Sequence, residues 1–160
     1  MMAPALGRRM ACWLYEGVLL FGVVFIAAYL FSTLTQTRNP LTNLLGLRLF
    51  LALVLAIYFA WFWSRGQTLA MKTWHIRVVD RHGAKISQGR ALARYLLSWV
   101  WFVPPLAAAA TWALPAGEVA VTTLGWVLVW GLASRLHPQR QFWHDAWAGT
   151  QLISSGPQSR

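Results

Sequence analysis

Acidic residues are scarce in this chain, and so is cysteine. The 160 residues hold 4 Asp+Glu against 14 Lys+Arg, which leaves a formal net charge of +10. The one cysteine, Cys12, excludes an internal disulfide. Charged residues make up only 11% of the chain, whereas a soluble domain carries roughly 25%. Because acids are few and no residue resembles an activated nucleophile, we expect a protein that is not an enzyme.

Metal ligands and nucleic-acid-binding features are also lacking. His137 and His144 are seven residues apart, but Pro138 intervenes, and no His/Cys/Asp/Glu cluster has metal-ligand spacing. We therefore expect no metal and no cofactor. The excess of cations is compatible with nucleic acid or with a membrane surface. No soluble basic domain remains once the apolar runs are set aside, so we expect contact with anionic lipids and no nucleic-acid partner.

Apolar residues dominate the chain, at 58% of its length. Four apolar runs approach the roughly 20 residues needed to cross a bilayer. We predict an all-α integral membrane protein of one domain with four transmembrane helices, at about residues 13–34, 44–63, 95–114 and 119–136. The first run is too long for the core of a signal peptide, so we expect an uncleaved span. Pro104 and Pro105 remove two backbone donors, so we expect the third helix to bend or break.

The long polar loop, residues 64–94, has its own predicted structure. Strand-forming residues at 74–79, a turn closed by Gly83, and residues 84–87 predict a small β-hairpin within Thr73–Ser87. We expect Ser87 to cap a basic helix that leads into the third span. Near the C-terminus, apolar residues at helical spacing predict a helix over residues 139–150 that lies in the membrane interface.

The positions of the cations predict the orientation of the spans. With four spans and both termini inside, every Lys and Arg except Arg38 and Arg48 faces the cytoplasm. We therefore expect a multi-pass protein of the bacterial cytoplasmic (inner) membrane, with both termini and the 64–94 loop in the cytoplasm.

Charged residues close to the lipid are the candidate functional groups. Arg9 and Glu16 are seven residues apart, about two helical turns, so they share one helix face. A carboxylate at the depth of Glu16 is unfavourable unless it is paired or protonated. Two readings stay open: a structural ion pair, or a carboxylate that binds a cation or proton. Arg48, near the start of the second span, is read mainly as an anchor that reaches to the interface.

Besides Arg9 and Glu16, the chain carries an acid near its C-terminus, Asp145, in a His144-Asp145 pair. These three positions resemble the RDD family of membrane proteins, which is named for one arginine and two aspartates. The supporting matches are segments 66–72, 77–83, 89–94 and 142–150, so the resemblance covers about residues 7–153. The chain departs from the pattern at Glu16, which stands for an aspartate, and at Ala70, which stands for a glycine.

The resemblance implies a membrane protein whose biochemical role is mostly undefined, with cation/proton exchange in some members. Two hypotheses therefore remain open beside a weaker one, an enzyme acting on lipid. The first is transport of a small cation or proton-coupled solute through Arg9, Glu16 and Asp145. The second is a non-transporting membrane subunit that docks a partner protein or assists its assembly. A homo-oligomer or a membrane-protein partner fits either hypothesis.

Overall fold

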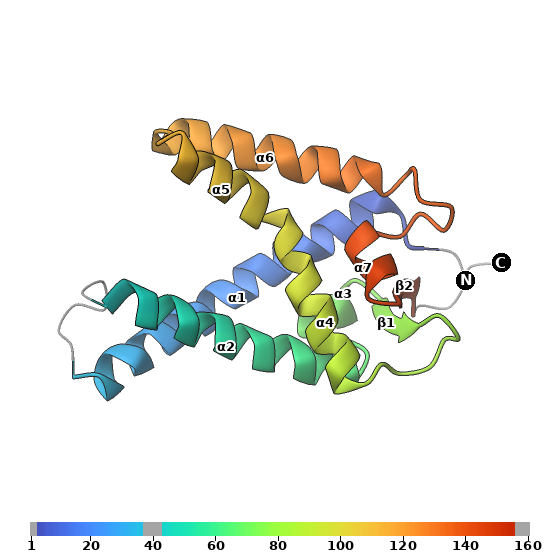
Figure 1. The fold of residues 1–160 in the computed structure, drawn as a ribbon. Helices are drawn as coiled ribbons and strands as arrows, with labels where there is room; N and C mark the ends of the chain where they lie inside the picture. The colour runs from blue at the N-terminus through green and yellow to red at the C-terminus, as the bar shows by residue number, and fades with distance from the viewer. Residues whose placement is uncertain (1–2, 37–42, 156–160) are drawn as a thin grey trace.

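The computed structural model describes residues 3–36 and 43–155, and most of these are helical (Figure 1). In chain order the elements are α1 (Leu6–Leu34), α2 (Leu44–Ser64), α3 (Leu69–Thr73), β1 (Ile76–Asp80), α4 (Gln88–Ser98), the 3₁₀ turn η2 (Trp99–Trp101), α5 (Val103–Thr111), α6 (Ala116–Ala133), α7 (Trp143–Trp147) and β2 (Thr150–Ser154). The predicted turn at residues 35–40 lies mostly outside the described residues, as do Arg38 and Arg160 of the orientation argument.

Three described helical segments are long and apolar enough to cross a membrane: Leu6–Leu34, Leu44–Thr73 and Ala116–Leu136. A fourth span exists if the bent pair of α4–η2 and α5 is counted as one. The described residues therefore hold three candidate spans, or four if the bent pair is one span.

The predicted break in the third span is confirmed. The helix axis bends by 42° between the two halves, and α5 starts with Pro104 and Pro105 in its first turn. Proline is tolerated there because the first N–H groups of a helix have no partner within the helix. The prolines therefore begin a new helix instead of disrupting the middle of one.

The strand in the polar loop is found, but the predicted hairpin partner is wrong. Strand β1 pairs antiparallel with β2, with Val78 opposite Leu152 and Asp80 opposite Thr150. After β1, the Asp80 carboxylate accepts hydrogen bonds from the backbone N–H groups of His82 and Ala84, which closes the turn. The chain then runs directly to Ser87, which caps α4 as predicted. The C-terminal strand supplies the buried side chains that β1 needs opposite it, since Thr150, Gln151 and Leu152 are all buried.

The predicted interfacial helix at residues 139–150 is also corrected. Only Trp143–Trp147 is helical, and the chain from Thr150 onward is β2. Helix α7 turns His144 and Asp145 into the protein, while Trp147 is 56% exposed. The pattern of aromatic residues predicts an amphipathic surface helix, but His144 and Asp145 on that segment find hydrogen-bond partners inside the fold.

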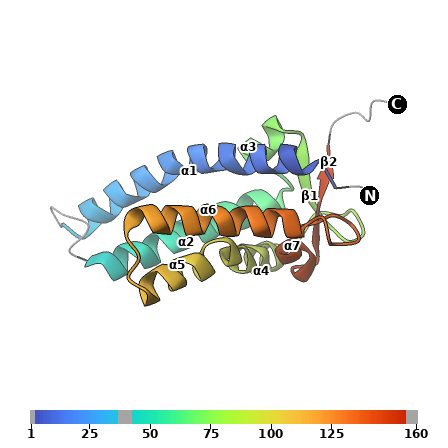
Figure 2. The same cartoon turned by 90° about the horizontal axis from the view of Figure 1, so that it is seen from above.

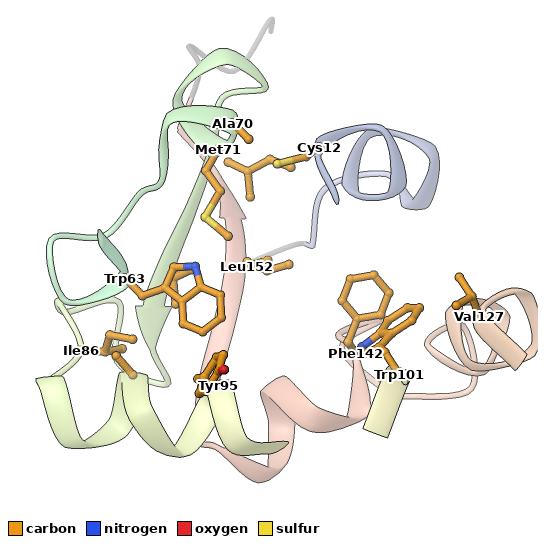
Figure 3. Packing of buried hydrophobic residues seen from close by; sticks show 13 residues of the cluster. Cys12, Trp63, Ala70, Met71, Ile86, Tyr95, Trp101, Val127, Phe142 and Leu152 are labelled. Carbon is orange, nitrogen blue, oxygen red and sulfur yellow. The ribbon is translucent and has the colours of Figure 1, made fainter. Parts of the chain in front are cut away.

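The short elements gather at one end of the helices, and we call this region the polar end: α3, β1, β2, α7 and the starts of α1 and α4. Figure 2 shows the long helices running lengthwise, with the sheet and α7 at this end and the α5–α6 connection at the other. The buried hydrophobic cluster lies here. Figure 3 shows Met71, Trp63, Tyr95 and Leu152 around the space between the helices and the sheet.

The long helices expose apolar side chains over most of their length. Phe21 is 75% exposed and Leu34 is 74% exposed, and many others on α1, α2 and α6 are similar. A soluble monomer rarely exposes such continuous apolar surface to water, whereas in a bilayer this surface contacts lipid chains at no free-energy cost. The tertiary core at the polar end therefore joins helices whose outer faces suit a bilayer.

Candidate functional site

One face of α1 turns three side chains inward near its start. Arg9, Cys12 and Glu16 are buried there, at intervals of three and four residues. This spacing places them above one another on the same side of a helix. The prediction that Arg9 and Glu16 share a face is therefore confirmed.

Asp145 is held by a chain of polar contacts across α4, α7 and η2. The Arg94 Nε–H donates to Asp145 Oδ1 at 2.7 Å, and both side chains are buried. His144 Nε2 lies 3.1 Å from the same oxygen. The Trp101 indole N–H donates to His144 Nδ1 at 3.1 Å. Since an indole can only donate, Nδ1 must accept, and the His144 proton sits on Nε2 facing Asp145.

The electrostatics of Asp145 follow from these contacts. Burial alone would raise the pKa of the Asp145 carboxyl, but the charge of Arg94 and the hydrogen bonds from Arg94 and His144 outweigh it. The pKa of Asp145 is therefore well below its usual range, and the carboxylate stays ionised. Asp145 and Arg94 form a charge-neutral pair that joins α7 to α4, although Asp145 Oδ2 and Arg94 Nη1 have no partner in the described residues.

Glu16 has neutral partners instead. The Tyr58 hydroxyl on α2 donates to Glu16 Oε1 at 2.8 Å, and the Thr68 hydroxyl donates to Oε2. Thr68 also caps α3, because its side chain accepts from the Met71 N–H. Within the described residues, no Lys, Arg or His forms an ion pair with Glu16.

Arg9 forms no hydrogen bond or ion pair with either acid in the described part of the chain. Its Nη2 donates to the Ser134 hydroxyl at 3.3 Å, and its guanidinium lies 4.3 Å from the ring centre of Phe142. Its Nε and Nη1 have no hydrogen-bond partner among residues 3–36 and 43–155. The arginine that contacts Asp145 is therefore Arg94 rather than Arg9.

A partly open cavity of about 540 Å³ connects these groups. Arg9, Glu16, Arg94 and His144 all lie on its walls, and Asp145 sits directly behind the last two. The remaining walls are mainly apolar and come from α1, α2, α4 and η2. The three predicted charges are thus grouped around one cavity. Arg48 is exposed near the start of α2, away from the polar end, and takes no part.

Sequence reasoning missed three members of this site: Arg94, Thr68 and Tyr58. Arg94 had a readable signal, because among the cations of the loop it shares a helix face with Ala91 and Tyr95. Thr68 lies within one of the motif segments that carried the family resemblance. Tyr58 gave a weaker signal, namely a hydroxyl in an apolar span that needs a partner.

Metal ligation has no support in the described residues. No group of three or more His, Cys, Asp or Glu side chains there is placed to hold an ion.

The fold and the site define a multi-pass helical membrane protein with a charged cavity at one end of its spans. The family model of the RDD family matches residues 3–149, and the chain belongs to this family. No curated protein and no solved structure matches the chain.

Proposed function

We propose that this RDD protein is a membrane transporter in which Glu16 binds and releases a proton or a small cation. The observation that carries the proposal is the contrast between the two buried acids. Asp145 is neutralised by an arginine at 2.7 Å, while Glu16 faces the cavity with hydroxyl donors only.

The charge of Glu16 explains why this contrast bears on function. Hydroxyl donors orient a carboxylate, but they do not form an ion pair with it, and the nearby Arg94 is already paired with Asp145. Inside a membrane such a charge is unfavourable unless a proton or a counter-ion joins it. Glu16 needs a mobile positive charge and lies on a partly open cavity, so it could bind and release a proton or cation during transport. Asp145 cannot serve in this way, because Arg94 already compensates it.

The broken third span supports the same reading. The break at Phe102 lies on the cavity wall, next to Trp99 and Trp101, which also line it. Interrupted helices near a binding site occur in transporters, where the break allows one half to move against the other. A change in the 42° bend would alter the cavity wall opposite α1.

Proton or cation flux in liposomes containing the purified protein tests the proposal. We expect Glu16→Gln to fold with normal yield and to abolish flux, because the amide keeps the size of the side chain but cannot carry the exchangeable charge. Glu118→Gln is the matched control, since Glu118 is an exposed acid at the start of α6. Flux retained in Glu16→Gln would refute the role of Glu16.

One observation favours a second candidate function, a non-transporting subunit that docks or assists a partner protein. Helix α6 exposes a row of large apolar side chains, including Val121, Leu124, Leu128 and Leu132. A partner helix that packs along this row would bury it. Absence of flux in the wild-type protein, with normal folding, would favour this function over transport.

We also propose that the polar end lies in the cytoplasm of a bacterium, at the inner membrane. The loop cations belong to this end, whereas Arg48 lies toward the opposite end of α2. The asymmetry of cations on the two sides of a membrane favours this orientation.

A further inference from the structure

The cavity has two chemically different parts. Its charged part contains Arg9, Glu16 and Arg94 at the polar end. Its apolar part continues along α1 as far as Leu20, opposite Leu55 on α2 and Phe102 at the break. From Arg9 to Leu20 the helix rises by roughly 16 Å at 1.5 Å per residue. The cavity is therefore long, with a polar floor and apolar walls.

The buried lining atoms that lack a partner are hydrogen-bond donors, while one acceptor without a partner in the described ranges, Asp145 Oδ2, lies behind the wall. Arg9 Nε and Nη1, Arg94 Nη1 and Trp63 Nε1 are buried and have no partner in the described ranges. Arg9 and Arg94 are each only 4% exposed, and both line the cavity. Glu16, the acceptor on the same wall, already receives two hydroxyl groups. The lining therefore has more free donors than acceptors, and an oxyanion in the cavity would supply acceptors for them.

The two guanidinium groups are held in place by aromatic rings. Arg9 stacks on Phe142 at 4.3 Å, and Arg94 lies over Trp63 at 4.0 Å from its ring centre. A guanidinium fixed over a ring keeps its N–H edge free for a carboxylate or phosphate. Asp145 neutralises Arg94, but the hydrogen-bond acceptor seen for Arg9 is the neutral Ser134. With Glu16 protonated, the charged part carries a net positive charge from Arg9.

We propose that this cavity binds an amphiphile with an oxyanion head and an apolar tail. The head lies against Arg9 and Arg94, and the tail lies between α1, α2 and η2. The volume of about 540 Å³ is within the roughly 300–1,000 Å³ typical of small-molecule pockets. This inference deepens the proposed function, because it names the solute that Glu16 protonation would accompany. A free fatty acid and an anionic phospholipid share this chemistry.

Other ligand classes fit less well. A small free anion would contact the guanidinium groups but leave the apolar walls uncovered. A neutral lipid would cover the walls but leave the buried donors unpaired, which is unfavourable. A lone cation could pair with Glu16, but it would leave the unpaired donors of Arg9 and Arg94 and the apolar walls unsatisfied.

Equilibrium binding to the purified full-length protein in detergent tests the inference. Radiolabelled palmitate is the probe, with protein-free micelles as the blank. Hexadecanol shares its tail without the oxyanion, and butyrate shares its head without the tail. Phosphatidylglycerol and phosphatidylcholine serve as competitors that differ in net charge. We expect saturable palmitate binding that hexadecanol and butyrate displace at least about tenfold less well than unlabelled palmitate.

Variants locate the head group. Arg9→Gln removes the unpaired donors without breaking the Arg94–Asp145 pair, and we expect it to weaken binding about tenfold or more. Arg9→Lys keeps the charge but not the planar fork, and we expect an intermediate loss. Arg90→Gln is the control, because Arg90 is an exposed arginine of the same helix α4 as Arg94. It should bind as the wild type does.

Each outcome bears on the inference. If phosphatidylglycerol competes with palmitate and phosphatidylcholine does not, the natural ligand is an anionic phospholipid. If palmitate binds and neither phospholipid competes with it, the natural ligand is a free fatty acid. Equal binding of hexadecanol, no binding at all, or unchanged affinity in a folded Arg9→Gln protein would overturn it. If Arg9→Gln does not fold, the inference is tested by Arg9→Lys and by the comparison of palmitate, hexadecanol and butyrate on the wild-type protein. Binding without flux would overturn only the transport proposal, and flux without binding would overturn only this inference.

Discussion

Replacing Asp145 by asparagine is the sharpest test of how the polar end is held together. Asp145 is fully buried and accepts from Arg94 Nε at 2.7 Å. Asparagine has nearly the same shape, but it leaves the buried Arg94 cation without its counter-charge. Breaking a buried ion pair from one side costs about 3–5 kcal/mol. Because the amide oxygen can still accept a hydrogen bond, we expect the lower end, about 3 kcal/mol.

Thermal unfolding in a mild detergent, followed by tryptophan fluorescence, measures this loss. For a chain of this length, about 3 kcal/mol corresponds to a decrease in Tm of roughly 6–12 °C. Glu118→Gln is the control, since it removes one exposed acid far from the polar end. It should leave Tm nearly unchanged.

A double-mutant cycle separates loss of the pair from loss of a single residue. In Arg94→Gln combined with Asp145→Asn, neither buried charge remains alone. We expect the double variant to lose less stability than the two single variants together, with a coupling of about 1–3 kcal/mol. If Asp145→Asn shifts Tm no more than Glu118→Gln does, or if the two losses simply add, the pair does not hold α4 to α7 as argued.

Three further predictions follow from the polar end. The pKa of Asp145 is lowered in the folded state, so its contribution to stability is present above the unfolded value of about 3.9. The difference in Tm between wild type and Asp145→Asn should therefore be constant from about pH 5 to 8 and shrink only below about pH 4. Cysteines at Arg77 and Ile153, which are opposite in the sheet, should crosslink under oxidation in a chain with Cys12→Ser; failure to crosslink would contradict the β1–β2 pairing. Reporter fusions after Arg160 and near Gly83 should both report a cytoplasmic location, and a periplasmic signal from either would contradict the proposed orientation.

The break of the third span and the cap of α4 could be predicted because both depend on neighbouring residues. Adjacent prolines remove donors wherever they occur, and the Ser87 side chain reaches an N–H only three residues away. The shared face of Arg9 and Glu16 is likewise a property of helical spacing. The family motifs placed Asp145 among the functional candidates, but they did not identify its arginine.

The errors have a common physical origin. Alternation of strand-forming residues shows that β1 is a strand, but it does not show which segment completes its hydrogen bonds. The turn closed by Gly83 predicts residues 84–87 as the partner, yet the C-terminal strand pairs with β1 and supplies buried side chains. The aromatic residues of the last segment predicted a surface helix, because spacing cannot reveal that His144 and Asp145 find partners inside.

The sequence by itself determined that this is a helical membrane protein with cations at one end, because apolar length, proline position and charge asymmetry act locally along the chain. Only the tertiary structure decided which arginine neutralises Asp145 and which acid is left with hydroxyl partners. Arg94 and Asp145 are 51 residues apart, and Glu16 is 42 residues from Tyr58. Such pairs form only when α1 packs on α2 and when α4 packs on α2 and α7, and that packing distinguishes the ion-paired Asp145 from Glu16 with its hydroxyl partners.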